Sequence, residues 1–311
     1  MPDAAVKLVP AWEVPKRGKG GSLASRQALL HSLVHIENAA IDLSWDVIAR
    51  FGGDPSYRLP RQFFDDFVRV AHDECRHFLL LERRLEGCGS RYGALAAHDG
   101  LWESAAATAG SLGARLAVEH CTHEARGLDV LPQTVARFRS GGDKESADLL
   151  QNVILAEEVS HCAAGVRWLR HLHAVARQSG GQGVDAAAEN GEQQQQQQQQ
   201  PAAGAEQQVA AGAERQPAAG GEQRPAAGGE QRPAALPEWA AEAARHASVE
   251  TWFHSLIRKH FRGPLKPPFN DDARAQAGFG PEWYMPLTAE FIDGQAAAEA
   301  EAQQQPANGQ A

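Results

Sequence analysis

Apolar side chains recur every three or four residues in four long stretches of this 311-residue chain. The stretches cover approximately residues 22–51, 60–86, 102–126 and 143–173. This spacing places the apolar side chains on one face of an α-helix, because about 3.6 residues complete each turn. The pattern therefore predicts an all-α fold, a four-helix bundle over residues 22–173. Gly127-Leu128-Asp129 is expected to end the third helix, with a short helix following it over residues 132–139.

Acidic and histidine side chains lie within these apolar stripes, where solvent is excluded. They are Glu37, Glu74, His77, Glu124, Glu158 and His161. Their order is Glu, Glu-x-x-His, Glu, Glu-x-x-His on four successive predicted helices, which is the ligand set of a carboxylate-bridged dinuclear metal site. Four unpaired carboxylates on core faces would be very unfavourable, whereas two divalent cations would balance their charge. Carboxylate oxygens with one imidazole per metal suit two iron ions, with manganese as the alternative.

A purely structural interpretation explains one motif but not the whole set. Two exposed capping glutamates and two hydrogen-bonded core histidines would account for either Glu-x-x-His pair taken alone. They would not account for ligand-type side chains placed in register on four predicted helices. The sequence therefore favours the metal site.

Three further residues are candidates for contacts around the predicted ligands. His120 lies one turn before Glu124, where it could bind a metal or relay protons, and a hydrogen-bonded role beside the ligands is the preferred interpretation. Asp73 and Glu157 each precede a ligand glutamate. Metal-bound imidazoles usually donate their second N–H to such a carboxylate. The sequence does not choose between these two acids and the nearby Asp42 and Asp46.

Three segments lack the helical pattern. Residues 1–21 are expected to form an extended arm. Residues 174–235 contain the run Gln193–Gln200 and near-repeats of Pro-Ala-Ala-Gly-Gly-Glu-Gln-Arg. Such a segment has almost no large apolar side chains to offset the entropy of ordering, so we expect a disordered low-complexity insertion. Residues 288–311 are expected to be a disordered tail for the same reason.

The apolar pattern returns in residues 236–287. A further helix is predicted over residues 237–260, with apolar side chains too numerous to leave in water. The three prolines between residues 264 and 268 exclude regular helix after it. We therefore expect this additional C-terminal helix to pack on the bundle, followed by an ordered strap with Phe269 as an anchor.

Charge and cysteine content narrow the choice of partner and compartment only slightly. The formal net charge is −9, but residues 1–175 carry 20 basic and 22 acidic side chains and are nearly neutral. A nucleic-acid partner is therefore not indicated by charge. The four cysteines show no paired spacing, and no apolar run reaches membrane-spanning length. We expect a cytoplasmic protein without a membrane partner, and the sequence leaves open whether it is a homodimer.

Several longer strings resemble the DUF455 family of ferritin-like proteins, whose function is not established. They are His35-Ile36-Glu37, Asp73-Glu74-Cys75-Arg76-His77, Ala97-His98-Asp99-Gly100-Leu101-Trp102, Glu124-Ala125-Arg126-Gly127-Leu128-Asp129, Glu158-Val159-Ser160-His161 and the segment from His260 to Asn270. The resemblance implies a ferritin-like bundle with a dinuclear iron site at the residues named above. It supplies no substrate.

The ligand set and the resemblance together favour a non-haem di-iron carboxylate protein, or one with a manganese–iron pair. The leading hypothesis is an O₂-dependent oxidoreductase or hydroxylase. By broader analogy the chain is similar to the tRNA-modifying hydroxylases built on the same bundle. Its substrate, a small molecule or a modified nucleotide, is not identified. Two alternatives remain at this point. One is a ferroxidase-type iron-handling protein without an organic substrate, and the other is a manganese catalase-like peroxide scavenger.

Overall fold

The computed structural model describes residues 6–197 and 236–290, with side chains described up to residue 179 and from residue 236. Within these ranges the chain is helical, and β-structure is limited to two isolated bridges. The predicted all-α class is confirmed. The start of the predicted arm (1–5), much of the predicted insertion (198–235) and most of the predicted tail (291–311) lie outside the described residues.

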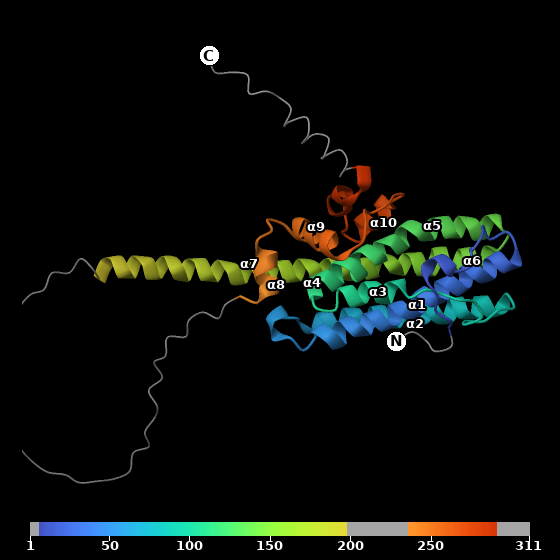
Figure 1. Cartoon of the computed structure of the whole chain (residues 1–311), viewed down its shortest axis with the longest axis horizontal. Coiled ribbons are helices and arrows are strands. Elements are labelled where there is room, and N and C mark those ends of the chain that lie inside the picture. The colour runs from blue at the N-terminus through green and yellow to red at the C-terminus, as the bar shows by residue number, and fades with distance from the viewer. Residues whose placement is uncertain (1–5, 198–235, 291–311) are drawn as a thin grey trace, which may run out of the picture.

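The body of the molecule consists of long helices packed side by side (Figure 1). Helices α1 (Leu23–Phe51) and α2 (Arg61–Gly87) pack along each other. The next long element joins α4 (Leu112–Arg115), a π-helical segment η3 (Leu116–His123) and α5 (Glu124–Ser140). The last joins α6 (Lys144–Leu149), a second π-helical segment η4 (Leu150–Ile154) and α7 (Leu155–Gln197).

Side-chain caps explain where these elements begin. The Ser22 hydroxyl accepts a hydrogen bond from the backbone N–H of Ser25 at the start of α1. Asp143 accepts one from Ser146 at the start of α6. Ser111 caps α4 in the same way, so the third long element begins at Leu112 and not at residue 102 as predicted. Residues 100–107 form the separate short helix α3 (Gly100–Ala107).

Helix α5 continues through two positions that were predicted to interrupt it. It runs without a break from Glu124 to Ser140, past Gly127 and Pro132. Proline has no N–H, so the carbonyl of Leu128, four residues earlier, loses its helical donor. The side-chain amide of Asn270 donates to this carbonyl at 3.1 Å and replaces the missing bond. The prediction of a separate short helix over 132–139 was wrong. The donor that compensates for Pro132 is Asn270, which is distant in the sequence.

Helix α7 also extends further than expected. The fourth helix was predicted to end near residue 173, but α7 continues to Gln197. Val175 and Ala176 are buried, so the start of the predicted insertion belongs to the packed helix. Among the described helices, none is both long and apolar enough to cross a membrane.

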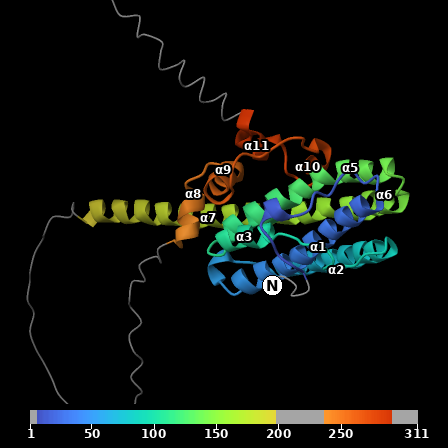
Figure 2. The same ribbon diagram turned by 45° about the vertical axis from the view of Figure 1, so that its right-hand side comes forward.

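In the C-terminal segment, α9 to α11 lie over η3, α5 and α7 on the side away from α1 and α2, whereas α8 crosses α7 and Trp239 contacts Tyr57 in the connection between α1 and α2 (Figures 1 and 2). It contains α8 (Glu238–Ala244), α9 (Val249–His260), α10 (Asp271–Gln276) and α11 (Pro281–Tyr284). One helix was predicted over 237–260. The structure has two helices there. The first, α8, ends at Ala244, and α9 begins at Val249 because Ser248 and Thr251 form a capping box.

A buried ion pair fixes this segment to α5. The guanidinium of Arg274 donates to both carboxylate oxygens of Asp129, at 2.8 and 2.6 Å. It also stacks on the rings of Phe269 and Tyr284, 4.7 and 4.3 Å from their centroids.

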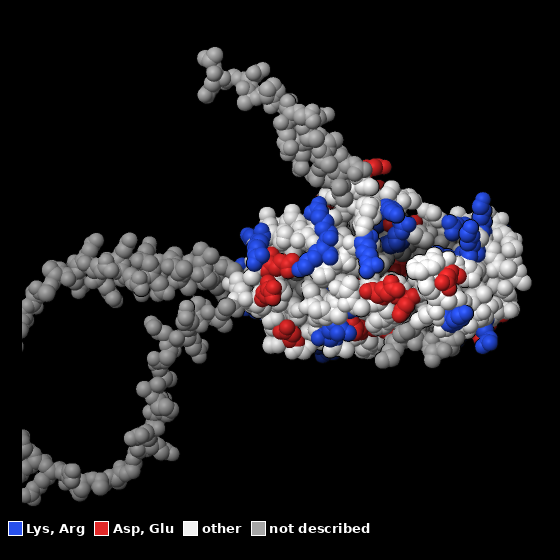
Figure 3. All heavy atoms as spheres, viewed as in Figure 1, with Lys and Arg blue, Asp and Glu red and all other residues white. Residues whose placement is uncertain are grey.

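Basic and acidic side chains are scattered in small groups over the face seen in Figure 3.

Candidate metal centre

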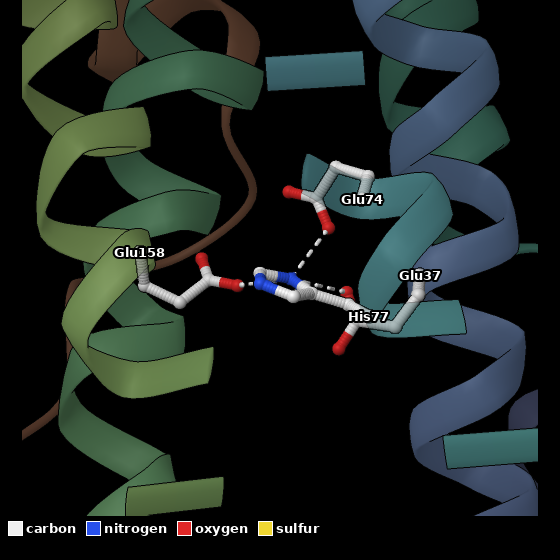
Figure 4. Close-up of side chains that lie close together, drawn as sticks. All are labelled: Glu37, Glu74, His77 and Glu158. Atoms are coloured by element: carbon white, nitrogen blue, oxygen red, sulfur yellow. Dashed lines mark hydrogen bonds and ion pairs between the residues drawn. The ribbon is translucent and has the colours of Figure 1, made fainter. Parts of the chain in front are cut away.

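The six residues singled out in the sequence come together between four helical elements. Glu37 comes from α1, Glu74 and His77 from α2, Glu124 from the first position of α5, and Glu158 and His161 from α7. They form two overlapping groups that could hold metal ions, with ligand atoms within 4.8 Å of one another. The first group is Glu37, Glu74, His77 and Glu158, shown in Figure 4. The second group is Glu74, Glu124, Glu158 and His161.

Glu74 and Glu158 belong to both groups, and their oxygens are divided between the two histidines. Oε2 of Glu74 lies 3.3 Å from Nδ1 of His77, and Oε1 lies 2.9 Å from Nδ1 of His161. Glu158 faces the same two nitrogens, with Oε1 at 3.6 Å from His77 and Oε2 at 3.8 Å from His161. Each carboxylate can therefore bridge two ion positions. Each position would also have its own glutamate and its own imidazole.

The outer nitrogens of the two histidines meet carboxylates from the opposite helix. Nε2 of His77 on α2 lies 2.8 Å from Oε2 of Glu157 on α7. Nε2 of His161 on α7 lies 3.6 Å from Oδ2 of Asp73 on α2. The interaction with His161 lowers the pKa of Asp73 to about 2, against the opposing effect of burial. If His77 donates from Nε2 to Glu157, its lone pair stays on Nδ1, the nitrogen that faces the ion positions.

Arg76 joins these two outer carboxylates and was missed in the sequence. Its guanidinium forms an ion pair with Glu157 and lies 3.6 Å from Oδ1 of Asp73. Arg76 is one of the two unspecified residues of the first Glu-x-x-His motif, so the motif does not predict its role. Its positive charge was the one sequence signal for a contact with nearby carboxylates. His120, by contrast, belongs to neither group. It packs on the ring of Phe67, and burial lowers its pKa to about 3, which leaves it neutral.

Burial and mutual repulsion oppose negative charge at the centre. Burial, followed by the charges of neighbouring carboxylates, raises the pKa of Glu37 and of Glu124 well above the ordinary value. The same two causes raise the pKa of Glu158 to about 7. Burial also acts to raise the pKa of Glu74, but His161 outweighs it and the net shift is downward. Without metal ions the site would therefore hold extra protons, which divalent cations would replace.

Local backbone structure places the ligands of α5 and α7. A π-helical segment ends immediately before Glu124, and another ends four residues before Glu158. In η3 the carbonyl of His120 approaches α7 at Gly165, where an added Cβ would lie only 1.9 Å from the carbonyl oxygen. Only glycine fits this crossing. π-Helical turns occur often at functional sites because the extra residue redirects the side chains that follow.

The donor set fits a pair of divalent transition-metal ions. It offers four carboxylates and two imidazoles in a buried space, and two such ions would neutralise the four negative charges. The ring nitrogens of His161 make no hydrogen bond to any described residue. Its 2.9 Å approach to Glu74 therefore lacks hydrogen-bond geometry, which leaves the imidazole available to a metal ion.

Comparison with known proteins gives a family and no function. Residues 2–218 match the family described as protein of unknown function (DUF455). The chain belongs to the DUF455 family. An uncharacterized protein of Haemophilus influenzae is 36% identical over 178 residues, which are 56% of this chain. This DUF455 chain thus spans 59% of the length of that relative. No solved structure matches the present chain.

Proposed function

We propose that the chain is a ferritin-like dinuclear metal protein that acts as an O₂-dependent oxidoreductase with two iron ions. In this proposal α1, α2, η3–α5 and η4–α7 are the four helices of the bundle, and residues 236–287 form the packed C-terminal helices and strap. The observation that carries the proposal is the position of Glu74 and Glu158, each with one oxygen toward each histidine. This arrangement is the one needed by bridging carboxylates.

The two ion positions would have the same types of ligand. Glu37 and His77 would hold one ion, Glu124 and His161 the other, and Glu74 and Glu158 both. A bound iron pair supplies the electrons and open coordination positions for chemistry with O₂. Asp73 and Glu157 would keep the imidazoles oriented through their outer nitrogens.

Burial of the ligands would keep bulk water from the reaction. Five of the six candidate ligands are buried, and Glu124 alone is partly exposed. A small substrate would therefore approach from the side of α5. The substrate itself is not identified by these residues, and a small molecule or a modified nucleotide remains the proposed class.

The test is a challenge of the full chain, loaded anaerobically with Fe²⁺, with O₂ and excess Fe²⁺. An oxidoreductase should oxidise about two Fe²⁺ ions per chain and then stop until a reductant is added. Continued oxidation with ferric mineral accumulating would favour an iron-handling protein and contradict the proposal. Rapid loss of hydrogen peroxide with the manganese-loaded chain alone would favour a peroxide scavenger instead.

A further inference from the structure

Glu119 is a buried acid that takes no part in the centre described above. Its side chain is 2% exposed, and neither carboxylate oxygen has a hydrogen-bond partner among the described residues. Burying such a group unpaired costs several kcal/mol, so a partner is expected. Burial raises its pKa to about 7, so a substantial fraction of the carboxyl groups is ionised at neutral pH.

Two other polar side chains lie beside this carboxylate, and one of them, the Ser104 hydroxyl, lowers the pKa of Glu119 against the larger effect of burial. Nε2 of His123, one turn further along η3, lies 3.8 Å from Oε2 of Glu119. The hydroxyl of Ser104 on α3 lies 3.2 Å from the same nitrogen. A separation of 3.8 Å is too long for a hydrogen bond.

The spacing of these donors fits a single metal ion. Nitrogen and oxygen ligands lie about 2.0–2.2 Å from a first-row divalent ion, so two of them are at most about 4.4 Å apart. Both separations, 3.2 and 3.8 Å, are within this limit. A carboxylate, an imidazole and a hydroxyl form a donor set suited to Mn²⁺, Fe²⁺ or Zn²⁺. An ion could reach the site from solvent, because the His123 side chain is 29% exposed.

We propose that Glu119, His123 and Ser104 bind a single divalent transition-metal ion at a site separate from the dinuclear centre. Glu119 and His123 belong to neither of the two groups described above. The site lies where η3 meets α3 and the end of α9, and the ring of Phe261, the residue after α9, is 5.8 Å from the ring of His123. This inference goes beyond the proposed function and does not depend on it.

The probe is Mn²⁺, titrated into the metal-free full chain and followed by metal analysis and electron paramagnetic resonance. An isolated Mn²⁺ ion gives a hyperfine-split signal that differs from the signal of a coupled pair. The wild-type chain should bind one ion more than the pair and show the isolated signal. Glu119→Gln should lose that ion and that signal. Glu103→Gln, at an exposed acid on α3, should behave like the wild type.

The outcomes separate this site from the dinuclear centre. Glu74→Ala should lose the metal pair and keep the signal of the isolated ion. A wild-type chain that binds the coupled pair but no isolated ion would overturn the present inference and leave the proposed function unaffected. An isolated signal that persists in Glu119→Gln would also overturn it. Helical content is checked by circular dichroism. If Glu119→Gln does not fold, His123→Gln replaces it and must lose the same ion for the site to stand.

Discussion

Replacing Gly165 with alanine should disrupt the crossing that places Glu124. The new Cβ would lie 1.9 Å from the carbonyl oxygen of His120 and 2.4 Å from its carbon. Both atoms are backbone, so no side-chain rotation can relieve the clash, and α7 and η3 must move apart. The interior is close-packed, so this movement disturbs every neighbour that it reaches.

The size of the effect follows from two opposing contributions. Overpacking a core typically costs about 1–3 kcal/mol, and a clash with rigid backbone belongs at the upper end. Alanine recovers up to about 1 kcal/mol of helix propensity relative to glycine. We therefore expect a net loss of about 2 kcal/mol in the free energy of unfolding, which lowers Tm by roughly 4–8 °C in a domain of this size. Metal binding should weaken as well, because Glu124 follows η3 directly.

The assay is thermal and urea unfolding by circular dichroism, with metal analysis of the folded protein. Gly127→Ala is the matched control, since its Cβ would meet only Oε2 of Glu158 at 3.6 Å, an ordinary contact. It should leave stability unchanged or raise it by up to about 1 kcal/mol. A Gly165→Ala protein with wild-type stability and full metal content would refute the reasoning.

Three further changes test other parts of the account. Asn270→Ala should destabilise the fold by about 2–4 kcal/mol, because the Leu128 carbonyl loses its donor and α10 loses its cap. Asp73→Asn should weaken metal affinity by about 10–100-fold by releasing the His161 ring. Metal affinity should fall as pH falls through 7, since protonated Glu158 competes with the ion. The free energy of unfolding of the metal-free chain should change in the opposite sense. Folded Glu158 keeps a proton that the unfolded chain releases, so this free energy should decrease as the pH rises from about 4.5 to 7.

Each of these predictions has a result that contradicts it. Asn152→Ala, at an exposed asparagine, is the control for Asn270 and should change stability by less than about 0.5 kcal/mol; equal effects of the two changes would remove the role given to Asn270. Isothermal titration with Mn²⁺ measures the effect of Asp73→Asn, and unchanged affinity would show that the His161 ring is held by other contacts. Affinity that is flat between pH 6 and 8 would contradict the raised pKa of Glu158.

The positions of the candidate ligands on their helices could be predicted from the sequence, because helical periodicity determines which residues share a face. Glu74 and His77, three residues apart, had to share a face of α2, and the same holds for Glu158 and His161 on α7. The sequence offered Asp73 and Glu157 as partners of the imidazoles, together with Asp42 and Asp46, and did not choose among the four. Their crossed pairing between α2 and α7 depends on how the helices pack, which local sequence does not encode.

The errors in the helix boundaries have two different origins. The break before α9 was readable, since Ser248 and Thr251 are a local capping signal that was overlooked in favour of the apolar pattern. The continuity of α5 was not readable, because the donor that compensates for Pro132 is Asn270, 142 residues beyond Leu128. The π-helical segments were equally hidden. In η3 the carbonyl of His120 packs closely against α7 at Gly165, a contact that local sequence does not reveal.

The central claim is that the six candidate ligands bind a pair of metal ions, and metal stoichiometry tests it most directly. The full chain is loaded anaerobically with Fe²⁺ or Mn²⁺, desalted and analysed beside Glu74→Ala, which removes a carboxylate shared by both ion positions. The account predicts about two ions per wild-type chain and a sharp loss of both in the variant. A Glu74→Ala protein that keeps a tightly bound pair would contradict it.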